Sequence, residues 1–185
     1  MQRTILAAPD ISAGLAELKD WLAVTTPRDD AVLAVLLHAA LDTCEGFTGA
    51  LPLLSECEEI LPASGEWQGL STRPVAAITA LEAIPAEGPR QLFAPDAYAL
   101  EIEADGTGRF RLLRQGHAGR VAVYFMAGLA REWNLLPDAL RHGAIRLAAH
   151  HYRARAEGET GSSPPAAPPS AIAALWRPFR RVRLA

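Results

Sequence analysis

The stretch from Val121 to Arg155 constrains the fold most, because it passes directly from a strand pattern to a helix pattern. Apolar side chains alternate over residues 121–126, which is the period of a pleated strand, and Gly128 ends the run. Pro137 suits the first turn of a helix, where the N–H that it lacks would have no partner. Asp138 then places negative charge at the positive end of the helix dipole. A strand that leads into an amphipathic helix predicts an α+β fold, and nothing in the passage resembles a catalytic site.

Two earlier helices are expected. Leucines recur at helical spacing over Asp10–Val24, and a continuous apolar stripe runs along Asp30–Phe47. Two antiparallel helices joined by a short turn are the expected arrangement. Prolines and glycines punctuate short apolar runs over residues 50–128, including a strand expected over 74–84, which indicates a β-rich insertion. The predicted fold is therefore a small helical bundle with a β-rich insertion between the second and third main helices.

The clearest unit of the insertion is a hairpin of Tyr98–Glu103 and Arg109–Leu113. A three-residue loop, Asp105–Thr107, would place Ile102 opposite Phe110, with apolar pairs on one face and oppositely charged pairs on the other. A two-residue loop would mix the faces, so we expect the three-residue loop.

The domain boundaries follow from composition. We expect a single α+β domain over residues 1–157, with helical parts at 10–48 and 137–156. Residues 158–170 are rich in proline, glycine and serine, which is typical of a linker, and 171–185 form an extended tail. The sequence shows neither a signal peptide nor an uninterrupted apolar run of about 18 residues, so no membrane contact is expected.

The histidines and cysteines do not predict a metal site. His150 and His151 are adjacent on a helix, so they point about 100° apart and cannot both bind one ion from that helix. We expect His151 to be a hydrogen-bonded core residue, and Cys44 to be a small buried hydrophobe. The two cysteines of the chain are too few and too loosely spaced for a disulfide framework, so no cofactor or metal is expected.

Candidate catalytic groups have simpler interpretations. Cys57 has Glu56, Glu58 and Glu59 as neighbours, which would raise the pKa of its thiol, and the glutamates are expected on a solvated edge. The segment Gly106–Gly108 lacks the third glycine of a phosphate-binding loop, and hairpin geometry explains it better. No serine lies in a G-x-S-x-G turn. We therefore expect no catalytic residues and no enzyme.

The C-terminal tail differs from the rest of the chain. The whole chain has a net charge of −3, yet its last fifteen residues contain four arginines and no acidic side chain. Large apolar side chains exposed in such a tail would invite a partner, since tryptophan and arginine are enriched at interface hot spots. Alternatively, the tail folds back on its own domain with its arginines in water. A nucleic-acid contact is a weaker alternative, because the overall charge is negative and no reader motif is present. The residues expected to bind a partner are Trp176, Arg177, Pro178, Phe179, Arg180, Arg181 and Arg183.

The order of these features resembles the head–tail connector, or adaptor, family of long-tailed phages and of the gene transfer agents derived from them. The early matches are L-A-E-L-K-D-W-L at Leu15–Leu22, the helix around Asp30–Phe47, and L-x-x-R-P-V-x-x-I at Leu70–Ile78. The later matches are Y-x-L at Tyr98–Leu100, V-x-V-Y-F-M-A-G-L at Val121–Leu129, L-P-D-A-L-R at Leu136–Arg141, and W-R-P-F-R-R at Trp176–Arg181.

The resemblance implies a structural protein of a virion or gene transfer agent particle, made in the bacterial cytoplasm and placed at the head–tail joint. Such adaptors form a ring, typically a dodecamer, beneath the portal protein. The ring extends the DNA channel without binding DNA specifically, and it presents a surface to a tail-proximal connector or stopper protein. The resemblance also implies that Trp176, Arg177, Pro178, Phe179 and Arg180 grip the portal or a neighbouring subunit. The alternatives are a non-viral oligomeric interaction module that docks through the same tail, and a small hydrolase.

Overall fold

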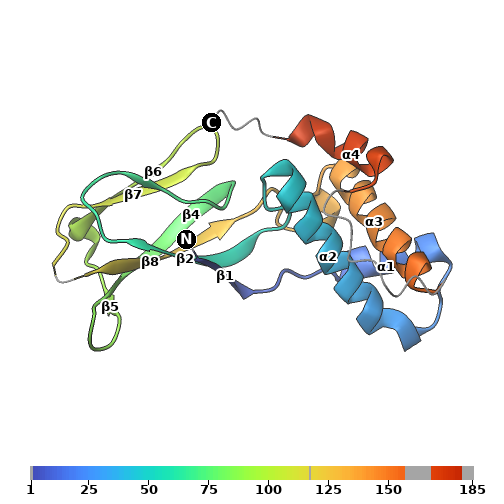
Figure 1. Ribbon diagram of the computed structural model, residues 1–185, viewed down its shortest axis with the longest axis horizontal. Coiled ribbons are helices and arrows are strands. Elements are labelled where there is room, and N and C mark those ends of the chain that lie inside the picture. The colour runs from blue at the N-terminus through green and yellow to red at the C-terminus, as the bar shows by residue number, and fades with distance from the viewer. Residues whose placement is uncertain (1, 117, 157–167, 181–185) are drawn as a thin grey trace. The chain divides into compact units, whose positions relative to one another are not determined.

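The structure, a computed structural model, describes residues 2–116, 118–156 and 168–180 (Figure 1). It contains helices and antiparallel sheets, so the predicted α+β class is confirmed. The chain forms two compact units. One, called here the β unit, combines Met1–Pro9 with Leu54–Leu129, and the other, called the helical unit, combines Asp10–Leu53 with Ala130–Ala185.

The β unit contains two antiparallel sheets. The first has the strand order β1 (Gln2–Ala7), β2 (Ser55–Pro62), β8 (Arg120–Ala127), β4 (Val75–Ile84), β5 (Gln91–Leu92). The second has the order β3 (Gln68–Gly69), β7 (Gly108–Leu112), β6 (Tyr98–Ile102), and a short 3-10 helix, η2 (Pro95–Ala97), precedes β6.

Strand β8 occupies the centre of the five-stranded sheet, between β2 and β4. The strand predicted there is confirmed, and Val121, Val123 and Phe125 are fully buried; Ala122 between them is fully buried as well. The strand expected over 74–84 is also confirmed as β4. Strand β1 was not predicted. It precedes the first helix in the sequence and pairs with β2, so the β unit is more than an insertion between helices.

The predicted hairpin forms, but its register was wrong by two residues. Ile102 lies opposite Gly108, and Leu100 lies opposite Phe110. The loop is shifted because Gly106 takes a left-handed conformation with φ of 79°, so the turn closes one residue earlier on the first strand and on the second. A shift of two residues keeps the apolar side chains on their predicted face, since side chains alternate with a period of two.

The helical unit contains the three main helices that were predicted. They are α1 (Ser12–Leu22), α2 (Asp30–Thr48) and α3 (Asp138–Ala156). Short 3-10 helices lead into α2 and α3, η1 (Pro27–Asp29) and η3 (Trp133–Leu135). A short helix, α4 (Ser170–Trp176), and the turn η4 (Arg177–Phe179) complete the unit. The linker predicted over 158–170 lies outside the described residues as far as residue 167.

Helix α2 supplies much of the core of the helical unit. By length and composition, the segment Pro27–Thr48 is also apolar enough to cross a membrane, a test that core helices pass as well. Its buried side chains recur at helical spacing and include Leu33, Leu37 and Cys44, which belong to one core cluster with residues of α1, α3 and α4. Packing within the unit therefore accounts for the buried stripe of α2, whereas other apolar side chains of the helix, such as Val35, are exposed.

Candidate assembly surface

The C-terminal segment, defined here as residues 168–180, begins with a proline that fixes the start of α4. The carbonyl oxygen of Pro169 accepts hydrogen bonds from the backbone N–H groups of Ile172 and Ala173, at 2.9 Å each. The α-helix ends at Trp176, and a 3-10 turn containing Pro178 follows, since proline cannot donate a hydrogen bond to continue an α-helix. The predicted motif Trp176–Arg181 thus begins on the last helical residue.

Trp176 is buried within its own unit, so the expectation that it is exposed was wrong. Its exposed fraction is 0%, and its indole N–H donates to the carbonyl oxygen of Leu140 at 3.3 Å. The ring lies against Gly143 of α3, where an added Cβ would come within 2.2 Å of the indole nitrogen. The physical reason is burial of a large apolar surface on a helix that lacks a side chain at that position. Figure 1 shows α4 lying along α3 within this unit.

The other described residues of the motif lie nearer the surface. Phe179 is half-buried and packs against the helical core, whereas Arg177, Pro178 and Arg180 are exposed. The guanidinium carbon of Arg180 lies 5.5 Å from the ring centre of Phe47 on α2, within the range of a cation–π contact. Arg181 and Arg183 lie outside the described residues. The motif therefore combines a buried anchor with an exposed, positively charged surface.

The earlier motifs of the helical unit make contacts inside that unit. Glu17 of α1 accepts a hydrogen bond from the indole N–H of Trp133 at 2.8 Å, and the guanidinium of Arg141 lies 3.6 Å away. Lys19 forms an ion pair with Asp30 of α2 at 2.6 Å. These contacts join the L-A-E-L-K-D-W-L segment to α2 and to the L-P-D-A-L-R segment. The motif residues named here therefore hold the helices together.

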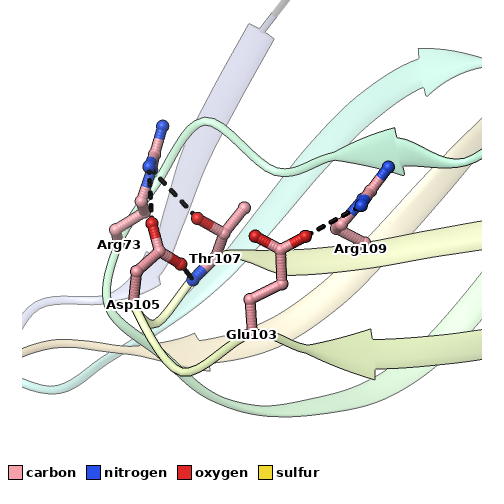
Figure 2. A network of polar contacts seen from close by, with 5 residues as sticks. All are labelled: Arg73, Glu103, Asp105, Thr107 and Arg109. Carbon is pink, nitrogen blue, oxygen red and sulfur yellow. Dashed lines mark hydrogen bonds and ion pairs between the residues drawn. The ribbon is translucent and has the colours of Figure 1, made fainter. Parts of the chain in front are cut away.

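The motif L-x-x-R-P-V of the β unit holds the hairpin turn. Figure 2 shows Arg73 reaching from the loop before β4 to Asp105 and Thr107 in the turn, at 3.4 Å and 3.1 Å. Asp105 also accepts the backbone N–H of Thr107 at 2.8 Å, while Arg109 pairs with Glu103 at 2.8 Å. The turn that could have been read as a phosphate-binding loop is thus fixed by side chains of its own unit.

Two glycines allow the hairpin to approach this motif closely. A Cβ at Gly106 would lie 2.6 Å from Cβ of Pro74, and one at Gly108 would lie 2.9 Å from a methyl group of Val75 and 3.0 Å from Leu70. Neither position has room for a side chain. The glycines of the hairpin and the L-x-x-R-P-V motif are therefore two halves of one packing contact.

The glutamates of β2 were predicted to lie on a solvated edge, and this was wrong for two of them. Glu56 is exposed, but Glu58 is 9% exposed and Glu59 is fully buried. The carboxylate of Glu59 accepts four hydrogen bonds, from the backbone N–H and hydroxyl groups of Ser71 and Thr72, at 2.7–2.9 Å. These bonds offset the loss of hydration and fix the loop before β4.

Glu58 belongs to a polar cluster on the opposite face of β2. The guanidinium of Arg90 lies 2.9 Å from Glu58 and donates to the hydroxyl of Tyr124 at 2.8 Å, and that hydroxyl donates to Glu82 at 2.9 Å. Burial and the hydrogen bond to Glu82 raise the pKa of Tyr124 above its usual value. The cluster joins β2, β8 and β4 to the loop before β5, and its groups are paired with one another.

Both cysteine side chains are buried, as expected of core residues, whereas the expected core position of His151 was wrong, because this side chain is only half-buried. Burial, followed by the charge of Glu45, raises the pKa of the Cys44 thiol to about 12. The thiolate needed for nucleophilic attack is therefore not formed near neutral pH. Cys57 is fully buried. His151 is half-buried, and burial, followed by the charge of His150, lowers its pKa. Among the described residues, no group of three or more His, Cys, Asp or Glu side chains could hold a metal ion.

Comparisons with known proteins give matches among solved structures. No family model matches the chain, and no curated protein matches it. A chain in the neck of an empty GTA particle, computed with C6 symmetry, has a TM-score of 0.78 and 28% identity, covering 100% of this chain and 98% of the other. A chain in the neck of a native GTA particle, computed with C12 symmetry, has a TM-score of 0.76 and 28% identity over the same shares. A chain in the virion of a native gene transfer agent particle has a TM-score of 0.74 and 27% identity, again over those shares.

Proposed function

Because these structures confirm the resemblance to head–tail adaptors, we propose that this chain is a structural subunit of the head–tail joint of a gene transfer agent or related phage-like particle. The observation that carries the proposal is similarity over the whole length, with a TM-score of 0.78 at 28% identity to a chain of a GTA neck. The similarity covers both compact units, so it concerns the complete arrangement of elements along the chain and not one common motif.

The proposed subunit works in a ring of about twelve copies beneath the portal protein, a number taken from the resemblance and consistent with rotational closure of one repeated interface. It joins the capsid vertex to the tail by binding the portal on one side and a tail-proximal connector or stopper on the other. The GTA necks computed with C6 and C12 symmetry support a ring. The net charge of −3 supports a channel wall that lets DNA pass, because like charge weakens contact with phosphates.

In this proposal, the exposed part of the C-terminal segment makes the docking contact. Arg177, Pro178 and Arg180 are exposed beside a tryptophan that is anchored in the helical core. An anchored segment loses less conformational entropy on docking than a free tail does, so it can present its charges with little ordering cost. The role is structural and not catalytic.

The location is tested by inserting an epitope between Glu87 and Gly88, where the loop is exposed, and expressing the chain in the particle-producing cell. Immunogold labelling of purified particles should place the epitope at the head–tail joint. Labelling elsewhere on the particle, or absence of the chain from particles while it remains folded in the cell, would contradict the proposal and favour a non-viral interaction module.

The docking contact is tested by the double charge reversal Arg177→Glu and Arg180→Glu. We expect particles that carry heads without attached tails, together with a nearly unchanged thermal midpoint for the isolated chain, since exposed substitutions change stability little and only the contact of Arg180 with Phe47 is lost. The matched control reverses Arg28 and Arg131, two exposed arginines of the same unit. If the Arg177→Glu and Arg180→Glu variant formed normal particles, the C-terminal segment would not be part of the docking surface, and the proposed location of the chain would still stand.

A further inference from the structure

Each sheet of the β unit has one long outer strand and one very short outer strand. In the five-stranded sheet the outer strands are β1, with six residues, and β5, with two. In the three-stranded sheet they are β6, with five residues, and β3, with two. An outer strand presents backbone N–H and C=O groups that can pair with another chain, and short outer strands are one way in which proteins prevent this. Only β1 and β6 are long enough to act as pairing edges among the described strands.

Both long edges also expose apolar side chains. On β1, Ile5 and Leu6 are 36% and 44% exposed, and on β6, Leu100 and Ile102 are 42% and 44% exposed. Neither strand contains proline or lysine, the residues that commonly protect an edge, and the one irregularity on β1 lies between Ile5 and Ala7. Apart from this bulge on β1 and one charged residue on each strand, the two edges lack such protections, and their exposed apolar side chains favour pairing with a further strand.

We propose that β1 of one copy pairs with β6 of the next copy, so that the two edges form the contact between neighbours in a ring. This inference rests on the proposed function, which requires a ring. A ring needs two different, complementary patches on each subunit, because a patch that binds itself closes a dimer. The two edges meet this requirement and carry opposite charge, since β1 contains Arg3 and no acid, whereas β6 contains Glu101 and no base.

The sequence of the two strands selects an antiparallel register. When Arg3 lies opposite Glu101 in an antiparallel pair, all five residues of β6 face a residue of β1, and Leu6 lies opposite Tyr98. The same charged pair in a parallel arrangement leaves Tyr98 and Ala99 beyond the end of β1. Oppositely charged and apolar cross-strand pairs both stabilise a sheet. The antiparallel register therefore uses more of both edges and places Thr4 opposite Leu100.

Disulfide trapping tests this register directly. The double variant Thr4→Cys and Leu100→Cys, oxidised mildly at high protein concentration, should give a ladder of covalent species that extends beyond the dimer on a non-reducing gel. The native cysteines do not interfere, because Cys44 and Cys57 are buried, with exposed fractions of 1% and 0%. The matched control is Val35→Cys with Leu135→Cys, two exposed positions of the helical unit that should give no ladder.

Mixing the single variants distinguishes a head-to-tail contact from a self-pairing edge. The Thr4→Cys chain alone and the Leu100→Cys chain alone should stay monomeric, and an equal mixture should stop at a covalent dimer. A dimer of the Thr4→Cys chain alone, a ladder as strong in the control, or no ladder in the double variant would each overturn the proposed pairing. Particles with the epitope at the head–tail joint but no such ladder would refute the edge contact alone, leaving the proposed function in place.

Discussion

Replacing Gly143 with alanine should release Trp176 from the helical core. An added Cβ would come within 2.2 Å of the indole nitrogen and 2.8 Å of Cε2, closer than real Cβ contacts, so the ring must move. Removing a buried tryptophan from a core costs about 3–5 kcal/mol, while alanine favours a helix over glycine by about 1 kcal/mol. The expected net loss in the free energy of unfolding is therefore about 2–4 kcal/mol.

The matched control is Gly46→Ala on α2, where an added Cβ meets no atom within 4 Å. This variant should be more stable than the wild type by up to about 1 kcal/mol, because only helix propensity changes. Urea unfolding followed by circular dichroism measures both variants, and a red shift of tryptophan fluorescence under native conditions reports release of the indole in the Gly143 variant. If both glycine variants were equally stable and had the same tryptophan emission maximum, Trp176 would not pack against α3, and the described anchor would be refuted.

Three further predictions concern other parts of the chain. Gly106→Ala should lower the free energy of unfolding by about 2–3 kcal/mol, and Gly88→Ala by only about 1 kcal/mol. Both glycines have positive φ, but only a Cβ at Gly106 would meet a neighbouring atom, at 2.6 Å. Equal urea midpoints for the two variants would contradict this. Glu59→Gln should lower the free energy of unfolding by about 2–4 kcal/mol, because an amide cannot accept the same four hydrogen bonds. The control Glu56→Gln, at an exposed position, should change it by no more than about 0.5 kcal/mol. Equal urea midpoints for the two variants would argue against the buried network. Because the pKa of His151 is lowered in the folded chain, the unfolded chain takes up the proton first as the pH falls below about 6.5, and stability is lost there. The free energy of unfolding of His151→Gln should therefore fall less than that of the wild type between about pH 7.5 and 5.5. If the two stabilities fell in parallel with pH, this contribution of His151 would be excluded.

The parts of the fold that were predicted are those with a local signal. Helices α1, α2 and α3 and strand β8 each carry a hydrophobic period long enough to identify the element from its own residues. The predicted hairpin register placed each side chain on the correct face but was wrong by two residues. Alternation determines which face a side chain takes, but it does not determine where the turn closes. The closing point depends on Gly106 and on its fit against Pro74, which is distant in the sequence.

The features that the sequence did not predict depend on partners far along the chain. Strand β1 is defined by pairing with β2, and its own six residues show no clear period. Glu59 is buried because Ser71 and Thr72 supply its hydrogen bonds. A glutamate in a run of acids looks solvated until those donors are placed beside it, although the serine and threonine before an Arg-Pro pair were a usable signal in the sequence.

The burial of Trp176 changes how the C-terminal docking proposal has to be tested. Removing residues 171–185 would take away the partner-binding arginines together with a core tryptophan, so loss of assembly would follow from either role. Arg177 and Arg180 are exposed and can be reversed without emptying the core, whereas Gly143→Ala disturbs the anchor and keeps both charges. If docking requires the segment to be held in place, both changes should abolish tail attachment, but only the glycine variant should be less stable. If the segment docks as a free tail, the glycine variant should attach tails as well as the wild type does, and preorganisation would be excluded as its source of affinity.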